Sequence, residues 1–593
     1  MIKKAVLLLL LAAAGIAVWA FLVNGVKQAE APPKVQDAAP AIAHNLSALW
    51  SGTQPSEAWQ AQAQAIYLAA RRQGRRLAHV WVYEPSIAAA VQQLKLALDD
   101  ERDAQSVDVL ELVLARDFKN LNPRDRGWST NIHRGVHGFE IAHEDIIERY
   151  APTYMLSTNR DTRRLIKLFQ VQHGLSDQQM LEQVSYRSFQ AEQWLIRLGT
   201  EPRAQAMERG NTFVPVESVN QDSTKKLAAL ATQWMQTNLQ DNGRMTYKYW
   251  PSARQESTSN NMIRQWMATI ALIRAAKHWQ DDALMQRAAN NIDYNLQQFY
   301  HEENGHGLIE FRGKIKLGAV ALAALALVEH PQSQRWAKQE AALRRTTDYL
   351  WNDNGMFTTF YKPKGRNDIQ NFYPGEALLY WAFLYERDRE PERLKRILAS
   401  FKYYRDWHLN PANRNPAFIP WHTQAYYKIW QITGNEELKD FIFKTNDWLV
   451  DVMQQWEGDV LYRDTLGRFY SASRPYGPPH VSSTGVYMEG LIDAFELAKA
   501  ESDVERAERY RKSIIRGLRS VMQLQFDSDL DMFYVPKALH PRVYGGMRTT
   551  VYNNEIRCDN VQHNLMAVLK ILQGFQPQDY AHNGKPQTPE QAK

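Results

Sequence analysis

The C-terminal part of this chain is a run of twelve predicted helices that alternate between two kinds. They are expected at residues 223–239, 259–277, 282–300, 316–329, 333–351, 374–387, 391–406, 417–432, 435–455, 484–500, 503–525 and 559–572. The odd members carry one charged face, which is typical of helices on a protein surface. The even members, such as KLGAVALAALALV, are apolar nearly all round, as for helices packed on every side. Six such pairs can close into a ring with the apolar helices inside.

This alternation predicts a mainly α protein in which residues 201–575 form an (α/α)6 toroid. The loops before the apolar helices are long and polar, whereas the loops after them are short. Functional side chains concentrate on such loops when a rigid scaffold holds them. The helix N-termini add unpaired N–H groups and a partial positive charge, which suit anionic or hydroxyl-rich ligands. We therefore expect the functional site at the rim where the inner helices begin.

Composition narrows the class of partner. The formal net charge is +6, but Lys and Arg are mixed with Asp and Glu, so no nucleic-acid partner is expected. The chain contains 18 Trp, 27 Tyr and 21 Phe, and such rings fill cores but also line carbohydrate clefts. The single cysteine, Cys558, excludes an intrachain disulfide and a cysteine-based zinc site. We expect neither a cofactor nor a bound metal.

The N-terminus predicts a membrane location. Lys3 and Lys4 precede an apolar run over residues 5–23, which approaches the ~20 residues that span a bilayer. We interpret residues 1–26 as an uncleaved signal anchor, with a cleaved signal peptide as the alternative. The positive-inside rule then predicts a single-pass protein of the bacterial inner membrane with its bulk in the periplasm. Residues 27–43 are interpreted as a linker and 576–593 as a flexible tail.

Residues 44–200 are predicted to form a small α/β domain. Helices are expected at 56–73 and 161–173, and strands at 79–83, 106–115 and 135–141. The strand Val107 to Leu114, the turn Gly135-Val136-His137-Gly138 and the segment Ala151-Pro152-Thr153 followed by Asn159 resemble the α/β domain of the AMMECR1 type. That family's Arg-Gly-Cys-x-Gly motif is absent, so no function is transferred and an accessory or packing role is expected.

The polar starts of the inner helices supply the candidate site residues. The catalytic candidates are Glu376, Glu489, Asp559 and His563. The substrate-binding candidates are Trp250, Asn261, Arg264, Tyr373, Trp421, His422, His480, Tyr487, Tyr552 and Arg557. A carboxylate in the first turn of an apolar helix either balances the helix dipole or, when buried in a cleft, becomes a general acid. Asn261 and Arg264 could equally be a helix cap and an interhelical ion pair.

Three short motifs accompany this architecture: Gly375-Glu376-Ala377, Trp421-His422-x-Gln424-Ala425 and Asp559-Asn560-x-x-His563. With them, residues 222–573 resemble the six-hairpin superfamily of carbohydrate-active proteins, which includes glycoside hydrolases, polysaccharide lyases and epimerases. The resemblance implies a polysaccharide or oligosaccharide as the partner. Fold alone does not settle the reaction, so three functions stay open.

The first is a polysaccharide hydrolase with Glu376 as the acid and Asp559 or Glu489 as the base, ~6.5–9.5 Å apart if inverting. The second is a lyase or epimerase of a uronic acid polymer. Its base would be His480, His563 or Tyr552, and Arg557 or Arg264 would stabilise the enolate-like charge. The third is a non-catalytic glycan-binding scaffold that works with envelope or exopolysaccharide assembly proteins.

Overall fold

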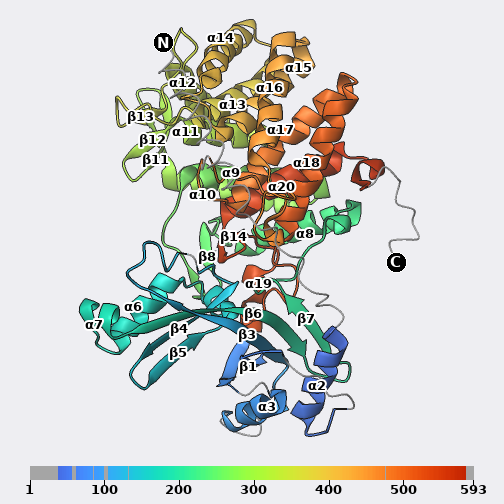
Figure 1. Ribbon diagram of the computed structural model, residues 1–593. Helices are drawn as coiled ribbons and strands as arrows, with labels where there is room; N and C mark the ends of the chain where they lie inside the picture. Colours follow the sequence, from blue (N-terminus) through green and yellow to red (C-terminus); the bar gives the residue numbers. More distant parts are fainter. Residues whose placement is uncertain are drawn as a thin grey trace, which may run out of the picture.

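The computed structural model describes residues 38–582 except for 56–61, 84–85, 99–104, 131 and 474–475. It has two parts, an N-terminal domain built on one sheet and a larger helical domain (Figure 1). The described residues also include short 3-10 helices at Val216–Ser218, Ser333–Trp336, Pro416–Phe418, Arg463–Thr465, Lys537–Leu539 and Pro577–Tyr580.

Six inner helices form a closed ring in the helical domain. They are α9 (Met262–Trp279), α11 (Leu317–Glu329), α13 (Tyr373–Asp388), α15 (Ile419–Thr433), α17 (Val481–Ala500) and α20 (Cys558–Gly574). Each packs against the next, and α20 packs back against α9. The toroid predicted from the alternation of helices is therefore confirmed.

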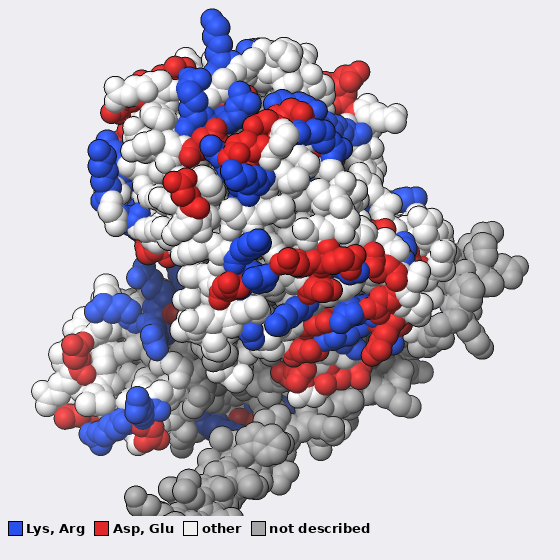
Figure 2. Space-filling view, turned by 90° about the horizontal axis from the view of Figure 1, so that it is seen from above, with Lys and Arg blue, Asp and Glu red and all other residues white. Residues whose placement is uncertain are grey.

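The outer helices cover this ring. They are α8 (Gln221–Asn238), α10 (Asp282–Phe299), α12 (Ala337–Tyr349), α14 (Pro391–Leu409), α16 (Glu436–Met453) and α18 (Val504–Met522), with a short α19 (His540–Val543) before the last hairpin. Side chains of Asn220, Asp281, Asn435 and Asp503 cap four of them by accepting a backbone N–H hydrogen bond. Figure 2 shows Lys and Arg interleaved with Asp and Glu on the face seen from above.

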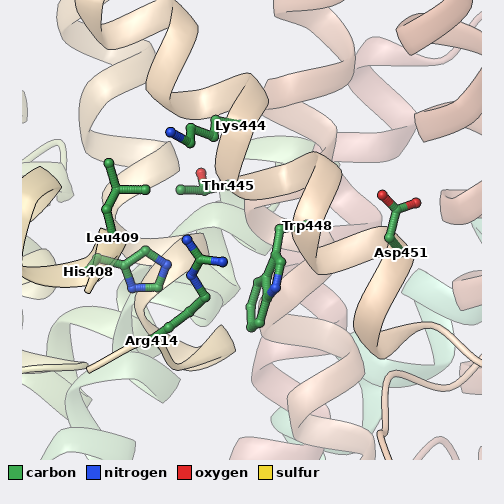
Figure 3. Close-up of a pocket in the computed structure, with 7 residues that line it drawn as sticks. All are labelled: His408, Leu409, Arg414, Lys444, Thr445, Trp448 and Asp451. Carbon is green, nitrogen blue, oxygen red and sulfur yellow. The ribbon is translucent and has the colours of Figure 1, made fainter. Parts of the chain in front are cut away.

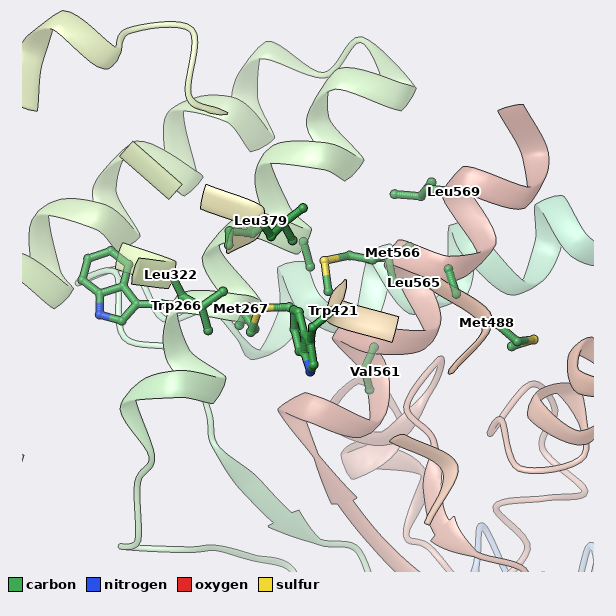
Figure 4. Close-up of a cluster of buried hydrophobic side chains, with 14 of the residues drawn as sticks. Trp266, Met267, Leu322, Leu379, Trp421, Met488, Val561, Leu565, Met566 and Leu569 are labelled. Carbon is green, nitrogen blue, oxygen red and sulfur yellow. The ribbon is translucent and has the colours of Figure 1, made fainter. Parts of the chain in front are cut away.

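The inside of the ring is filled with apolar side chains. Trp266, Met267, Leu322, Trp421 and Met566 come from four different inner helices, and all are buried (Figure 4). Burial of the inner helices on every side explains why their sequences lack a charged face. The polar groups are displaced to the helix starts.

Two small sheets lie in the loops before inner helices. One joins β14 (Arg548–Thr550), β15 (Asn553–Arg557), β8 (Lys248–Trp250) and β9 (Gln255–Glu256) in that order. The other joins β10 (Tyr300–Glu303), β11 (His306–Phe311), β12 (Lys314–Lys316) and β13 (Phe360–Lys362). The first sheet places the segment before α9 beside the segment before α20, about 300 residues later.

The N-terminal domain contains a seven-stranded antiparallel sheet in the order β2-β1-β3-β6-β4-β5, with β7 also paired to β6. The strands are β1 (Ala65–Arg72), β2 (Arg75–Val82), β3 (Val109–Leu121), β4 (His137–His143), β5 (Ile146–Tyr150), β6 (Ser185–Arg197) and β7 (Arg203–Met207). Its helices are α2 (Ala39–Ser51), α3 (Ile87–Leu96), α5 (Pro152–Ser157), α6 (Thr162–Gln172) and α7 (Asp177–Glu182). Apolar residues of α2 and α3 pack on β1 and β3.

The structure corrects several predictions for the terminal regions. The helix expected at 56–73 is wrong, because residues 65–72 form β1, paired on both sides by β2 and β3, and 56–61 lie outside the described residues. The linker ends earlier than predicted, since α2 begins at Ala39, and the domain continues past residue 200 through β7. The predicted tail begins with a 3-10 helix, in which Tyr580 is buried.

The predicted membrane location is also corrected. Residues 1–26, which carry the predicted anchor, lie outside the described residues. Within the described part of the chain, no helix combines the length and the apolar character needed to cross a bilayer. The most apolar one, α11, has 13 residues. This finding contradicts the single-pass inner-membrane prediction.

The N-terminal domain docks on the loops that precede α17 and α20. Asn159 donates to Asn553 Oδ1 at 2.9 Å, and Asn554 donates to the carbonyl of Leu156 at 3.1 Å. The imidazole of His133 and the hydroxyl of Tyr462 are hydrogen-bonded at 2.6 Å. The domain therefore contacts the same rim at which the inner helices begin.

Candidate functional site

The charged centre of the rim is Asp559, in the first turn of α20. Its carboxylate accepts from Arg557 Nε at 2.8 Å and is paired with Arg264 Nε of α9 at 2.7 Å. Asp559 is buried, with 3% of its surface exposed. Burial alone would raise the pKa of its carboxyl group. The two guanidinium groups outweigh burial and lower its pKa to about 2. Asp559 is therefore a fixed carboxylate whose two oxygens are both occupied.

A histidine–carboxylate dyad lies one turn further along α20. Nδ1 of His563 is 2.7 Å from Oε1 of Glu489 in α17. Glu489 is fully buried, whereas the side chain of His563 is 12% exposed. Nε2 of His563 has no hydrogen-bond partner among the described residues. This geometry orients the imidazole and leaves one ring nitrogen for a ligand.

Trp421 of α15 lies between the dyad and α13. The Trp421 and His563 rings meet edge-on, with their centroids 6.0 Å apart. On its other side, the Cβ of Trp421 lies 2.5 Å from the position that a Cβ on Gly375 would occupy. Glycine at 375 therefore allows α13 and α15 to approach closely. The carboxyl group of the adjacent Glu376 points instead to Gly318 of α11.

Glu376 differs from Asp559 in its surroundings. It is 2% exposed, and its Oε2 has no hydrogen-bond partner in the described part of the chain. Burial raises the pKa of this carboxyl to about 8, and the only opposing charge is Lys316. Glu376 is consequently protonated at pH 7 and can donate a proton.

The β8–β15 pairing adds further predicted residues to the rim. Trp250 Nε1 donates to Glu555 Oε2 at 2.8 Å, and Lys248 is paired with the same carboxylate at 2.9 Å. His480, at the start of α17, is half-buried, and burial followed by the charge of Arg557 lowers its pKa. One cluster around α9, α17 and α20 thus contains six of the predicted residues: Trp250, Arg264, His480, Arg557, Asp559 and His563.

Other predicted residues lie elsewhere or have structural partners. His422 is buried against Phe418, with ring centroids 3.5 Å apart, and burial lowers its pKa to about 3. Tyr487 packs edge-on against Phe469. Tyr552 faces the N-terminal domain, where Arg134 lies 5.6 Å from its ring. His422 and Tyr487 therefore contribute to packing, and Tyr552 contributes to the contact between the domains.

The two remaining candidates stand at helix starts. Asn261 caps α9, where its Oδ1 accepts from the N–H of Ile263 at 3.1 Å. Tyr373 opens α13, is 7% exposed and packs against Phe360 of β13. Sequence reasoning missed Tyr247 and Lys248, which contact Arg264 and Glu555. The available signal was their position directly before the predicted Trp250.

Among the residues that the structure describes, no group of three or more His, Cys, Asp or Glu side chains is arranged to hold a metal ion. A separate pocket of about 290 Å³ lies between α14 and α16, and Figure 3 shows Trp448 and Arg414 on its wall. It contains none of the predicted site residues.

Comparison with known proteins finds matches among solved structures. No family model and no curated sequence matches the chain. Among solved structures, a D-mannose isomerase is 13% identical and covers 60% of this chain and 99% of its own length, with a TM-score of 0.46. A cellobiose 2-epimerase from Bacillus thermoamylovorans is 11% identical, covering 60% and 98%, with a TM-score of 0.46.

A GH76A α-1,6-mannanase from Salegentibacter sp., solved with α-1,6-mannotriose, is 12% identical, covering 60% and 99%, with a TM-score of 0.44. All three are (α/α)6 toroid enzymes. Similarity at this level does not identify a reaction. The predicted AMMECR1-like character of the N-terminal domain is not confirmed.

Proposed function

We propose that the protein is a carbohydrate-active enzyme in which His563, oriented by Glu489, removes a proton from carbon, as in an epimerase or a lyase. The observation that carries this proposal is the 2.7 Å contact between His563 Nδ1 and Glu489 Oε1, together with the free Nε2. A carboxylate that accepts from Nδ1 fixes the tautomer in which Nε2 is the base.

The other groups fit the same chemistry. Nε2 of His563 would remove a proton from a carbon next to a carbonyl or carboxylate, leaving an enolate-like anion. Arg264, whose side chain is 31% exposed, would stabilise that charge. Glu376, protonated at neutral pH, would return a proton to carbon in an epimerase or protonate the leaving oxygen in a lyase. The partly buried Trp250 supplies an aromatic ring at the rim.

Hydrolysis by paired carboxylates has weaker support. Both proposed bases are engaged, because Asp559 holds two arginines and Glu489 is fully buried under His563. An inverting hydrolase needs a carboxylate that reaches a water molecule. Hydrolysis stays a second candidate because the protonated Glu376 is the acid that such a reaction requires.

Replacing His563 tests the proposal. The full chain is incubated with uronate-containing and neutral oligosaccharides in deuterated water, and NMR follows deuterium incorporation at carbon and the appearance of epimers. Absorbance in the near ultraviolet detects lyase products, and a reducing-end assay detects hydrolysis. We expect His563→Ala to lower the rate by about 10²–10⁴-fold, the usual contribution of a general base.

Glu489→Gln should give a smaller loss, because it keeps the shape of the dyad but reverses one hydrogen bond. His422→Asn is the control, since this histidine lies in the aromatic packing near Phe418 and outside the dyad. If new reducing ends appear without deuterium incorporation, the reaction is hydrolysis and the proposed proton transfer at carbon is wrong. Equal rates in the wild type and the His563→Ala variant would refute both roles for the dyad.

A further inference from the structure

A second pocket opens beside Glu376, between the start of α9 and the β11–β12 hairpin. Its volume is about 190 Å³. Its polar and aromatic lining consists of Asn260, Asn261, Phe311, Arg312, Lys314 and Lys316. No acidic residue belongs to the lining, and Lys316 is the residue directly before α11.

Both asparagines present hydrogen-bond donors to this pocket. Oδ1 of Asn260 accepts from the N–H of Asn261 at 2.8 Å and from Gln265 Nε2 at 2.8 Å. Oδ1 of Asn261 accepts from the N–H of Ile263. Because backbone N–H groups can only donate, these contacts fix the amide orientation, and both NH2 groups remain without a partner among the described residues.

The three cations of the pocket are uncompensated. Arg312, Lys314 and Lys316 form no ion pair with any described residue, whereas Lys362 on the adjacent β13 is paired with Glu310 at 3.0 Å. Burial and then the charge of Lys314 lower the pKa of Lys316. Glu376 offers no compensation while it is protonated, so Lys314 and Lys316 remain like charges in the lining of one cavity.

We propose that this pocket binds an anionic substituent of the saccharide, such as a carboxylate or a sulfate ester, and that the substrate is therefore an acidic glycan. The inference rests on the proposed function, since the pocket adjoins Glu376 through Lys316. Arg264 and Arg557, the two arginines among the predicted substrate-binding residues, are already paired with Asp559. The donors that lack an anion are those of the pocket.

A pocket made only of donors favours acceptor-only groups, and ionised oxygens are the strongest of these. Phe311 and Met262 add apolar surface against which a sugar ring can pack. A neutral sugar would use few of the donors and would leave the repulsion between Lys314 and Lys316 unrelieved. An acidic sugar removes that repulsion when it binds.

Isothermal titration calorimetry with the full chain carrying His563→Ala tests the pocket separately from turnover. The probes are oligouronates, sulfated oligosaccharides and neutral oligosaccharides of equal length. We expect an acidic probe to bind and the neutral probes to bind at least about tenfold more weakly, since charge-assisted hydrogen bonds each contribute about that factor. The two acidic probes distinguish a carboxylate from a sulfate.

Two variants test the residues. Lys314→Met with Lys316→Met should weaken acidic probes by more than about tenfold and leave neutral probes unchanged. Asn261→Asp keeps the α9 cap but replaces the NH2 donor with an anionic acceptor, and it should weaken acidic probes similarly. Lys364→Met is the matched control, because it removes one charge from an exposed residue outside the pocket.

The pocket assignment is overturned if acidic probes bind all variants with the same affinity as the control. It is also overturned if neutral and acidic probes bind equally well. Either result leaves the His563 test intact, because that test measures turnover. If the binding of acidic probes depends on these residues but the protein shows no turnover, the pocket assignment holds and the proposed reaction is refuted.

Discussion

Asp559 and Glu376 are the same chemical group in nearly the same setting, yet they are in opposite protonation states. Each lies in the first turn of an inner helix, and they are 3% and 2% exposed. Asp559 holds Arg557 and Arg264, and its pKa is lowered to about 2. Glu376 forms no ion pair among the described residues, and burial outweighs the opposing charge of Lys316 and raises its pKa to about 8.

The comparison teaches that partners, and not burial or the helix dipole, decide what these carboxyl groups do. Burial favours the neutral acid in both, and the helix start favours the anion in both. The two guanidinium groups reverse the balance only at Asp559. One side of the rim is thus a neutralised ion cluster that holds α9 to α20, and the other side keeps an available proton and unpaired cations.

Removing both arginines should have the largest effect on this comparison. Arg264→Met with Arg557→Met leaves Asp559 buried without a partner, and such losses cost about 3–5 kcal/mol. Urea denaturation would measure the free energy of unfolding. Adding Asp559→Asn should recover much of the loss, because the neutral amide needs no counter-charge. A loss below about 1 kcal/mol would show that water or relaxation compensates the carboxylate.

Glu376→Gln should change the pH dependence of stability by a smaller amount. The folded pKa of about 8 exceeds the unfolded value of about 4.5, so the folded state binds the extra proton between these values. Wild-type stability should therefore fall as pH rises from about 4.5 to 8, and the Gln variant should lack this fall. The variant should gain roughly 3 kcal/mol relative to the wild type between pH 4.5 and 7.

Thermal and urea unfolding at several pH values check this prediction. Glu392→Gln is the control, since Glu392 also lies in the first turn of a helix, α14, but is exposed. If the two Gln variants follow the same pH dependence, Glu376 does not hold a proton at neutral pH.

The smallest expected effect follows from Lys316→Met. Lys316 lowers the pKa of Glu376, so its removal should raise that pKa further, by less than about one unit. The pH-dependent fall in stability should then extend to higher pH. Lys364→Met should leave it where it is in the wild type. A shift to lower pH would mean that Lys316 does not act on Glu376 through its charge.

The two domains differ in how much of them could be predicted. The helical ring was predictable because inner and outer helices differ over many residues, and each periodic pattern reports one packing environment. The prediction of a helix at 56–73 was wrong because residues 65–72 form β1, a strand paired on both sides. In AIYLAARR, all residues but the last are buried, and a short apolar run buried on both faces has no period that separates strand from helix.

The site shows the same limit. Sequence reasoning named Glu376, Glu489, Asp559, Arg557, Arg264 and His563 as rim residues, because they stand at the polar starts of apolar helices. It did not predict that Glu489 and His563 are in contact across 74 residues, or that Tyr552 faces another domain. Those facts depend on the register between helices, which no local pattern records.

The sequence by itself determined a ring of six helical hairpins and the rim that carries its polar residues, because amphipathic periodicity follows directly from which face of a helix is buried. Only the tertiary structure decided which carboxyl group holds a proton, which arginines are already paired and which cations stay free. Charge states depend on distances of a few ångströms between segments hundreds of residues apart, and those distances exist only once the ring has closed.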